Sequence, residues 1–178
     1  MIIYIYMIEG VFMKKFNNKG FTLIELLATI VILGILMIIA IPMVSQYIKQ
    51  ARQSAFIDTA KAYVEAARYA YFGDGLNDDC SGVLDTGNGG TIYIAFSELR
   101  VDKTNDKSSF NRTIDLNKSY VKITSDAAGK YTYYVAMTDG YNGFSETAED
   151  VLKRKDVGNV TNIGIPASGV TKCTKSGT

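Results

Sequence analysis

The chain of 178 residues contains no histidine. Histidine is the most common general base and neutral metal ligand, so Ser-His-Asp or Cys-His catalysis and His-ligated zinc are excluded. The sequence also has no Gly-rich phosphate loop and no nucleophile motif. We therefore expect a protein that is not an enzyme and that needs no cofactor.

The sequence also lacks a charge excess of either sign, with 19 basic and 18 acidic residues. A balanced charge produces no large field to attract a polyanion, so we expect no nucleic-acid partner. Apolar residues make up 47% of the chain. They are concentrated in its first quarter, which makes their placement more informative than their number.

Residues 21–44 read FTLIELLATIVILGILMIIAIPMV and contain one charge, Glu25, and one proline, Pro42. About 20 helical residues cross the hydrocarbon layer of a bilayer, so this run predicts a transmembrane helix. Lys14, Lys15 and Lys19 precede the run. By the positive-inside rule they stay in the cytoplasm, which places the rest of the chain outside.

The first 20 residues are interpreted as a leader peptide. Residues 1–12 form a short apolar stretch that cannot span a bilayer, and we predict that translation starts at Met13. Residues 45–72 contain no Gly or Pro and repeat apolar residues at steps of three and four. This spacing predicts an amphipathic continuation of the helix, which Gly73 would end.

The rest of the globular domain, 45–178, is predicted to add a small antiparallel sheet to this helix. Residues 91–96, 120–124 and 130–137 are rich in β-branched and aromatic side chains, and a Gly-containing connection at 126–129 favours a hairpin. Residues 145–155 are predicted to form a short surface helix, and the tail from Val157 an irregular segment or edge strand. The fold class is therefore α+β, with the amphipathic half of the helix covering the sheet.

At the start of the apolar run, residues 19–26 read KGFTLIEL. This segment closely resembles the signature of type IV prepilins and pseudopilins. The resemblance implies the type IV pilin fold and cleavage by a prepilin peptidase between Gly20 and Phe21, with methylation of the new amino group of Phe21. It further implies that Glu25 pairs with the cationic Phe21 amino group of a neighbouring subunit during assembly, which would compensate an acid in an apolar helix.

Pro42 removes a helical hydrogen bond, and we expect it to bend or loosen the helix, with Gly34 as a weaker contributor. The resemblance adds the hypothesis that the 34–42 region melts when subunits pack into a fibre.

Cys80 and Cys173 are the only cysteines. Both are predicted to lie outside the membrane, where a disulfide is permitted, although two free thiols remain an alternative. An acidic loop follows the helix, but its spacing does not match an EF-hand, and we predict no metal there. Its members are Asp74, Asn77, Asp78 and Asp79.

The resemblance implies a structural subunit of a type IV pilus, anchored in the cell membrane and then assembled into an extracellular fibre for adhesion, twitching motility or biofilm formation. Its expected partners are further copies of itself, minor pilins, the prepilin peptidase, the membrane platform with its ATPase, and lipid before assembly. Two alternatives remain open. One is a pseudopilin of a type II secretion system or a minor pilin, and the other is a membrane-anchored sensor or binding domain that never polymerises.

Overall fold

The structure is a computed structural model that describes residues 20–73, 75–76, 80, 83–84, 89–99, 101, 106–160, 162–166 and 171–174. The predicted leader, 1–20, lies outside these residues except for Gly20. The chain divides between Val44 and Ser45 into two compact units. Helix α1 (Leu23–Phe72) contributes to both.

In the first unit, α1 carries the apolar run. Every large apolar side chain from Phe21 to Val44 is more than half exposed. In the part of the chain that the structure describes, α1 is the one helix long and apolar enough to cross a membrane, by length and composition. The helix continues through Pro42 without interruption.

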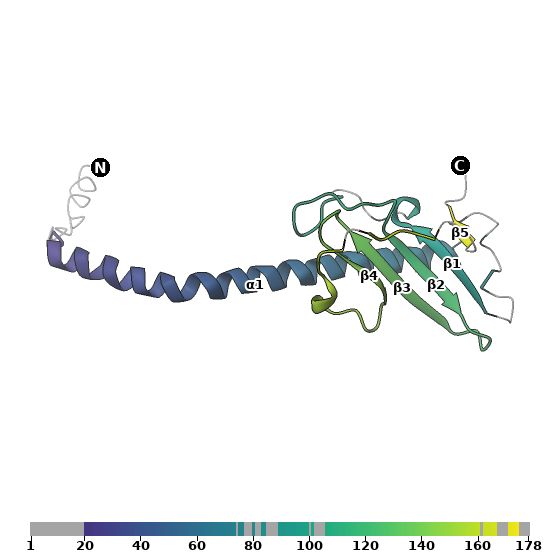
Figure 1. Cartoon of the computed structure of the whole chain (residues 1–178), viewed down its shortest axis with the longest axis horizontal. Coiled ribbons are helices and arrows are strands. Elements are labelled where there is room, and N and C mark those ends of the chain that lie inside the picture. The colour runs from purple at the N-terminus through teal and green to yellow at the C-terminus, as the bar shows by residue number, and fades with distance from the viewer. Residues whose placement is uncertain are drawn as a thin grey trace, which may run out of the picture. The chain divides into compact units, whose positions relative to one another are not determined.

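The second unit contains a five-stranded sheet in the order β4-β3-β2-β1-β5 (Figure 1). Its strands are β1 (Gly90–Ala95), β2 (Tyr120–Ser125), β3 (Tyr131–Thr138), β4 (Gly143–Ala148) and β5 (Thr171–Cys173). The short 3-10 helices η2 (Phe96–Glu98) and η3 (Arg154–Asp156) lie in the connections. The strands predicted at 91–96, 120–124 and 130–137 are confirmed as β1, β2 and β3.

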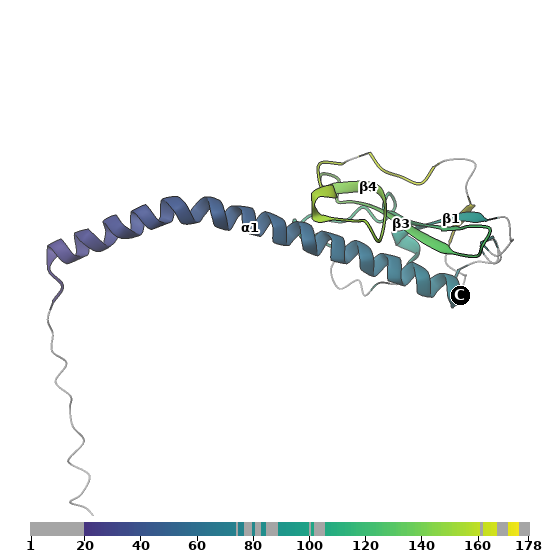
Figure 2. The same cartoon turned by 90° about the horizontal axis from the view of Figure 1, so that it is seen from below.

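Alternation along the strands explains why one face of the sheet takes the helix. Ile92 and Ile94 of β1 join the main core, whereas Tyr93 between them belongs to a smaller cluster on the other face. The main core also contains the buried side of α1 from Phe56 to Ala67. Figure 2 shows α1 along one face of the sheet and the C-terminal segment over the other.

Aromatic contacts join the helix to the sheet. Tyr63 of α1 stacks on Phe96 with ring centroids 3.8 Å apart, and Phe56 meets Phe144 edge to face at 6.1 Å. Such pairs add to the free energy gained from burying their apolar area. The predicted α+β arrangement, with the amphipathic half of the helix covering a sheet, is confirmed.

Two details of the prediction are wrong. Residues 145–155 do not form a surface helix, because residues 143–148 pair with β3 as strand β4 and the short η3 follows. The sheet is also not wholly antiparallel, since β5 pairs with β1 in parallel. The predicted tail does supply an edge strand, β5.

Candidate assembly site

The first turn of α1 is closed by a capping box. Glu25 Oε2 accepts hydrogen bonds from the Thr22 backbone N–H at 2.9 Å and from the Thr22 hydroxyl at 2.8 Å. The Glu25 N–H donates in return to Thr22 Oγ1 at 3.3 Å. A Thr-x-x-Glu sequence satisfies two helix-end donors in this way, so these residues start the helix where the apolar run begins.

The capping box also sets the electrostatic surroundings of the Glu25 carboxylate. A negative charge in the first helical turn interacts favourably with the positive end of the helix dipole. Both Thr22 contacts reach Oε2 rather than Oε1. Glu25 therefore sits within one helical turn of the Gly20–Phe21 bond, held by its own chain.

The predicted cleavage residues lie at the exposed beginning of the described chain. Gly20 and Phe21 precede α1, and both are exposed. A Cβ built on Gly20 meets no atom within 4 Å. A Cβ at this position would thus clash with none of the described residues, so their fold does not require glycine here.

Gly34 and Pro42 both lie within α1, well separated from the capping box. A Cβ on Gly34 also meets no atom within 4 Å. The predicted pairing of Glu25 with a neighbouring Phe21 and the predicted melting of 34–42 concern an assembled fibre and stay predictions.

Cys80 and Cys173 are joined by a disulfide across 93 positions of sequence. Both half-cystines are buried, and Cys173 belongs to the edge strand β5. In the chain-entropy account, closing so long a loop stabilises the folded state by about 4–5 kcal/mol. The bond ties the segment after α1 to the C-terminal edge of the sheet.

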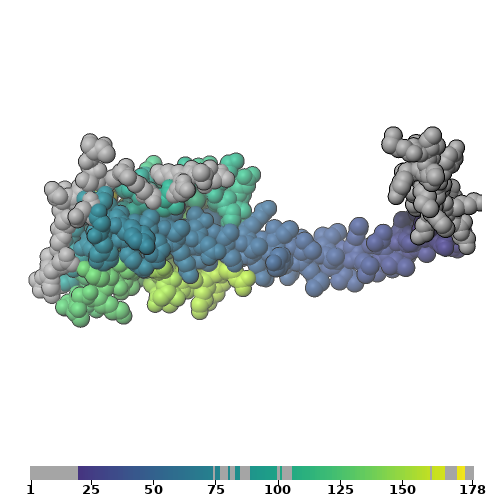
Figure 3. Space-filling view, turned by 180° about the vertical axis from the view of Figure 1, so that it is seen from behind, coloured from purple at the N-terminus to yellow at the C-terminus, as the bar shows by residue number. Residues whose placement is uncertain are grey.

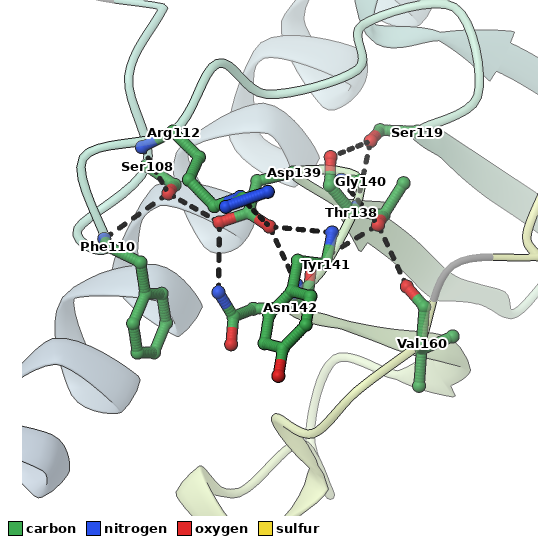
Figure 4. A network of polar contacts seen from close by, with 10 residues as sticks. All are labelled: Ser108, Phe110, Arg112, Ser119, Thr138, Asp139, Gly140, Tyr141, Asn142 and Val160. Carbon is green, nitrogen blue, oxygen red and sulfur yellow. Dashed lines mark hydrogen bonds and ion pairs between the residues drawn. The ribbon is translucent and has the colours of Figure 1, made fainter.

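A buried carboxylate, Asp139, was not singled out by the sequence. Its side chain is fully buried. It accepts hydrogen bonds from the Ser108 hydroxyl at 2.7 Å, from the N–H groups of Tyr141 and Asn142 at 3.1 and 2.7 Å, and from the Asn142 side-chain amide at 3.3 Å (Figure 4). Arg112 Nε lies 4.0 Å away. Burial raises the pKa of Asp139, but the hydrogen bonds outweigh it and hold the pKa below its usual value.

The neighbouring Thr138 extends this network to the C-terminal segment. Its hydroxyl donates to the Val160 carbonyl at 2.8 Å, and its N–H donates to Ser119 Oγ at 3.1 Å (Figure 4). The DGYNG sequence at 139–143 signals a turn, but nothing local identifies Ser108 or Val160 as its partners. The network therefore holds these loops in place through the hydrogen bonds that the carboxylate accepts.

A second polar cluster lies on the face of the sheet opposite α1. Lys122 Nζ binds Glu146 Oε1 at 2.6 Å and lies 4.8 Å from the Tyr134 ring centroid. The Tyr120 hydroxyl donates to Glu146 Oε2 at 3.2 Å, and burial together with this carboxylate raises the Tyr120 pKa well above its usual value. The Lys122–Glu146 ion pair therefore reaches across β3 and joins β2 to β4.

Among the described residues, no group of three or more His, Cys, Asp or Glu side chains could hold a metal ion. The predicted acidic loop residues lie outside the part of the chain that the structure describes. These are Asp74, Asn77, Asp78 and Asp79.

Comparison with known families gives one finding. The prokaryotic N-terminal methylation motif matches residues 15–41. The chain has no match among curated proteins and none among solved structures. The matched segment contains the Gly20–Phe21 bond, the Thr22–Glu25 capping box and most of the apolar run. The chain therefore carries, at residues 15–41, the leader signature of type IV pilins and pseudopilins.

Proposed function

We propose that the chain is a structural subunit of a type IV pilus. It is inserted in the membrane through residues 21–44, cleaved after Gly20, methylated at Phe21 and polymerised through this helix into an extracellular fibre. The observation that carries the proposal is the acid Glu25 at the start of an exposed apolar helix, inside the segment that matches the methylation motif.

The exposed apolar side chains of residues 21–44 must be shielded from water. Burying one large apolar side chain is worth about 1.5–3 kcal/mol, so a helix that exposes every such side chain from Phe21 to Val44 is unfavourable in water. Lipid provides the cover before assembly, and neighbouring helices provide it in the fibre. The proposed function thus gives the same surface two successive environments.

Glu25 has a role in this exchange. An acid among packed apolar helices is costly unless it is paired. Cleavage creates an amino group at Phe21, which methylation leaves cationic and which a neighbouring Glu25 would bind. Such a pair would fix the axial register of one subunit against the next. The prepilin peptidase, the membrane platform with its ATPase and minor pilins are the partners that this function requires.

The test compares Glu25→Gln with the wild type and with Asp150→Asn, which alters an exposed acid in a turn of the globular unit. Filaments are sheared from cells, and the mature N-terminus is determined by mass analysis. We expect methyl-phenylalanine at Phe21 in the wild type and a strong loss of filaments in Glu25→Gln alone. Normal filaments with Glu25→Gln would overturn the proposal.

A second variant tests cleavage separately. Gly20→Val changes a position where an added Cβ meets no atom of the described residues within 4 Å, so we expect their fold to be kept. We expect the uncleaved chain to accumulate in the membrane. Adhesion, twitching motility and biofilm formation are the uses that we propose for the fibre.

The leader signature is shared with pseudopilins, which is the second candidate function. The abundance of the chain in sheared filaments distinguishes the two functions. A major subunit dominates sheared filaments, whereas a pseudopilin of a type II secretion system or a minor pilin is scarce or absent there. A membrane-anchored domain that never polymerises would keep its function with Glu25→Gln.

A further inference from the structure

A groove of about 630 Å³ lies in the globular unit between α1 and the loop that contains η3. In Figure 3 this yellow-green loop lies directly against the blue part of α1. The described lining consists of Gln50, Gln53, Ser54, Ile57 and Asp58 from the helix and residues 152–155 from the loop. The volume falls within the range of small-molecule sites, so the groove can hold a ligand larger than a simple ion.

Contacts with α1 hold the loop side of the groove in place. Gln53 Nε2 donates to the Val157 carbonyl at 3.1 Å, and the Arg154 guanidinium donates to Gln50 Oε1 at 3.4 Å. Leu152 is buried in the main core. The backbone of the loop is therefore fixed before any ligand arrives, and binding does not have to order it.

The loop side of the groove carries three cations. Lys153, Arg154 and Lys155 are consecutive and exposed, and none of them has an ion pair among the described residues. Asp58 is the one carboxylate among the described residues that line the groove. The nearby Asp156 is not part of this lining, and its Oδ2 accepts from the Lys153 backbone N–H at 2.7 Å. Three cations and one carboxylate leave the lining with an excess of two positive charges.

This excess favours a ligand with two negative charges on one group. A phosphate monoester carries a charge of about −1.5 to −2 at pH 7 and presents three strong acceptor oxygens. A carboxylate, a sulfate ester or a phosphodiester carries a single negative charge and leaves part of the excess unmatched. Guanidinium and ammonium groups bind phosphate oxygens through short charge-assisted hydrogen bonds. The charges of the lining therefore indicate a phosphate monoester.

The helix side of the groove indicates what carries the phosphate. Gln50 Oε1 accepts from Arg154, so the NH2 group of Gln50 is left to donate. Gln53 Nε2 donates to Val157, so the side-chain oxygen of Gln53 is left to accept. Ser54 adds a hydroxyl that can do either. Donors and acceptors side by side match the hydroxyl groups of a sugar, each of which also donates and accepts.

We propose that this groove binds a sugar phosphate. The phosphate monoester lies against Lys153, Arg154 and Lys155, and the sugar hydroxyl groups bind the polar side chains of the helix. The described lining belongs to the globular unit alone. The inference therefore goes beyond the proposed function and does not depend on membrane insertion or on fibre assembly.

The test is isothermal titration calorimetry of the full chain in an uncharged detergent, with glucose 6-phosphate as the probe. We expect saturable binding that is about tenfold or more tighter than the binding of glucose, which lacks the charge. Glucose 6-sulfate and inorganic phosphate should each bind several-fold more weakly, because the first has one negative charge and the second has no sugar. Equal affinity for inorganic phosphate would overturn the sugar assignment, and equal affinity for the sulfate ester would overturn the phosphate assignment.

Two triple variants locate the binding site. The groove variant, Lys153→Gln/Arg154→Gln/Lys155→Gln, should weaken the binding of glucose 6-phosphate by about tenfold or more. The control variant, Lys107→Gln/Lys118→Gln/Lys130→Gln, removes three exposed cations outside the groove and should keep wild-type affinity. Equal affinities of the two variants would place the ligand elsewhere and would contradict the proposal.

A gain of affinity keeps the result independent of folding defects. Asp58→Asn removes the acid in the groove, and we expect it to bind glucose 6-phosphate more tightly than the wild type does. Misfolding cannot produce such a gain. Unchanged or weaker binding by Asp58→Asn, with an unchanged urea midpoint, would show that the phosphate does not lie in this groove.

The dependence on pH tests the charge of the ligand separately. The second pKa of a phosphate monoester is about 6. The groups that face it are Lys153, Arg154 and Lys155 of the loop and Asp58 of α1, with Asp156 nearby. Lys, Arg and Asp are residue types that ordinarily titrate outside pH 5.5–7.5, and the chain has no histidine. From pH 7.5 to pH 5.5 the affinity for glucose 6-phosphate should fall by up to about fourfold, while the affinity for glucose 6-sulfate stays constant. The same profile for both ligands would overturn the assignment of a doubly charged phosphate.

Discussion

The carboxylate of Asp139 is the most highly connected buried charge among the described residues, and it accepts only from donors. Asp139→Asn keeps the shape but turns one acceptor into an NH2 donor that faces Ser108, Tyr141 or Asn142. Leaving a buried polar group unsatisfied costs about 1–3 kcal/mol. We expect Asp139→Asn to lower the free energy of unfolding by that amount in urea denaturation.

Asp126→Asn is the matched control. Asp126 Oδ1 also accepts two backbone hydrogen bonds, from Ala128 and Lys130 at 2.9 Å each, but the residue is exposed. Water can replace these contacts, so we expect Asp126→Asn to lower the free energy of unfolding by less than Asp139→Asn does. An equal decrease in the free energy of unfolding of both variants would show that the burial of Asp139 does not increase the cost of the substitution.

The depressed pKa of Asp139 predicts a pH dependence of stability. The folded state binds this proton less readily than the unfolded state, whose Asp pKa is about 3.9. The stabilisation is therefore complete above that value and is lost as pH falls through the folded pKa. Between pH 5 and pH 3, urea midpoints should fall more steeply in the wild type than in Asp139→Asn, and parallel slopes would contradict this.

How far single residues can be predicted depends on how local their partners are. Thr22 and Glu25 are three positions apart, so the motif that identified Glu25 also contains the capping box that holds it. Ser108 and Asp139 are 31 positions apart, and no spacing rule connects them. The sequence accordingly indicated the end of the chain that we propose for assembly and missed the buried network.

At the level of elements, strands with clear alternation were predicted, whereas strand β4 and the parallel pairing of β5, which depend on their neighbours, were not. Residues 145–155 are rich in Glu, Ala and Lys, which favour helix locally. β3 offers an unpaired edge, and pairing with residues 143–148 satisfies it. β5 is three residues long, and its parallel pairing with β1 follows from tertiary placement beside the buried disulfide rather than from its own composition.

Two glycines that face each other across the end of β4 should respond differently to alanine. Gly143 and Gly158 exchange backbone hydrogen bonds at 2.8 and 2.9 Å. A Cβ on Gly143 would lie 2.5 Å from the Met137 carbonyl oxygen and 2.9 Å from that of Val160, whereas one on Gly158 meets nothing within 4 Å.

We therefore expect Gly143→Ala to lower the free energy of unfolding by about 1–3 kcal/mol, as overpacking does, and Gly158→Ala to change it by less than about 0.5 kcal/mol. Both values come from urea denaturation of the purified variants. Since both positions keep their N–H groups, loss of a hydrogen bond cannot explain a difference. Similar losses in both would mean that the strand end relaxes to admit the methyl group.

At the level of the whole molecule, burial and exposure follow the division of the chain. The first buried residue of α1 is Phe56, and no described residue from 20 to 55 is buried. The globular unit therefore draws its core from the later part of α1, the sheet and the buried disulfide. The apolar run contributes surface instead, which the proposed function covers first with lipid and then with other copies.

This separation predicts that a chain beginning at Ser45 folds by itself as a soluble monomer. It keeps every buried side chain of α1 and loses only the exposed apolar run. Its thermal midpoint should match the second-unit transition of the full chain in mild detergent, and the far-ultraviolet spectrum should show helix and sheet. A chain beginning at Ala62 is the informative comparison, because it loses Phe56, Ile57 and Ala60, whose burial is worth several kcal/mol. If the Ser45 chain fails to fold, residues 21–44 stabilise the globular unit; if the Ala62 chain folds equally well, the core does not depend on the helix.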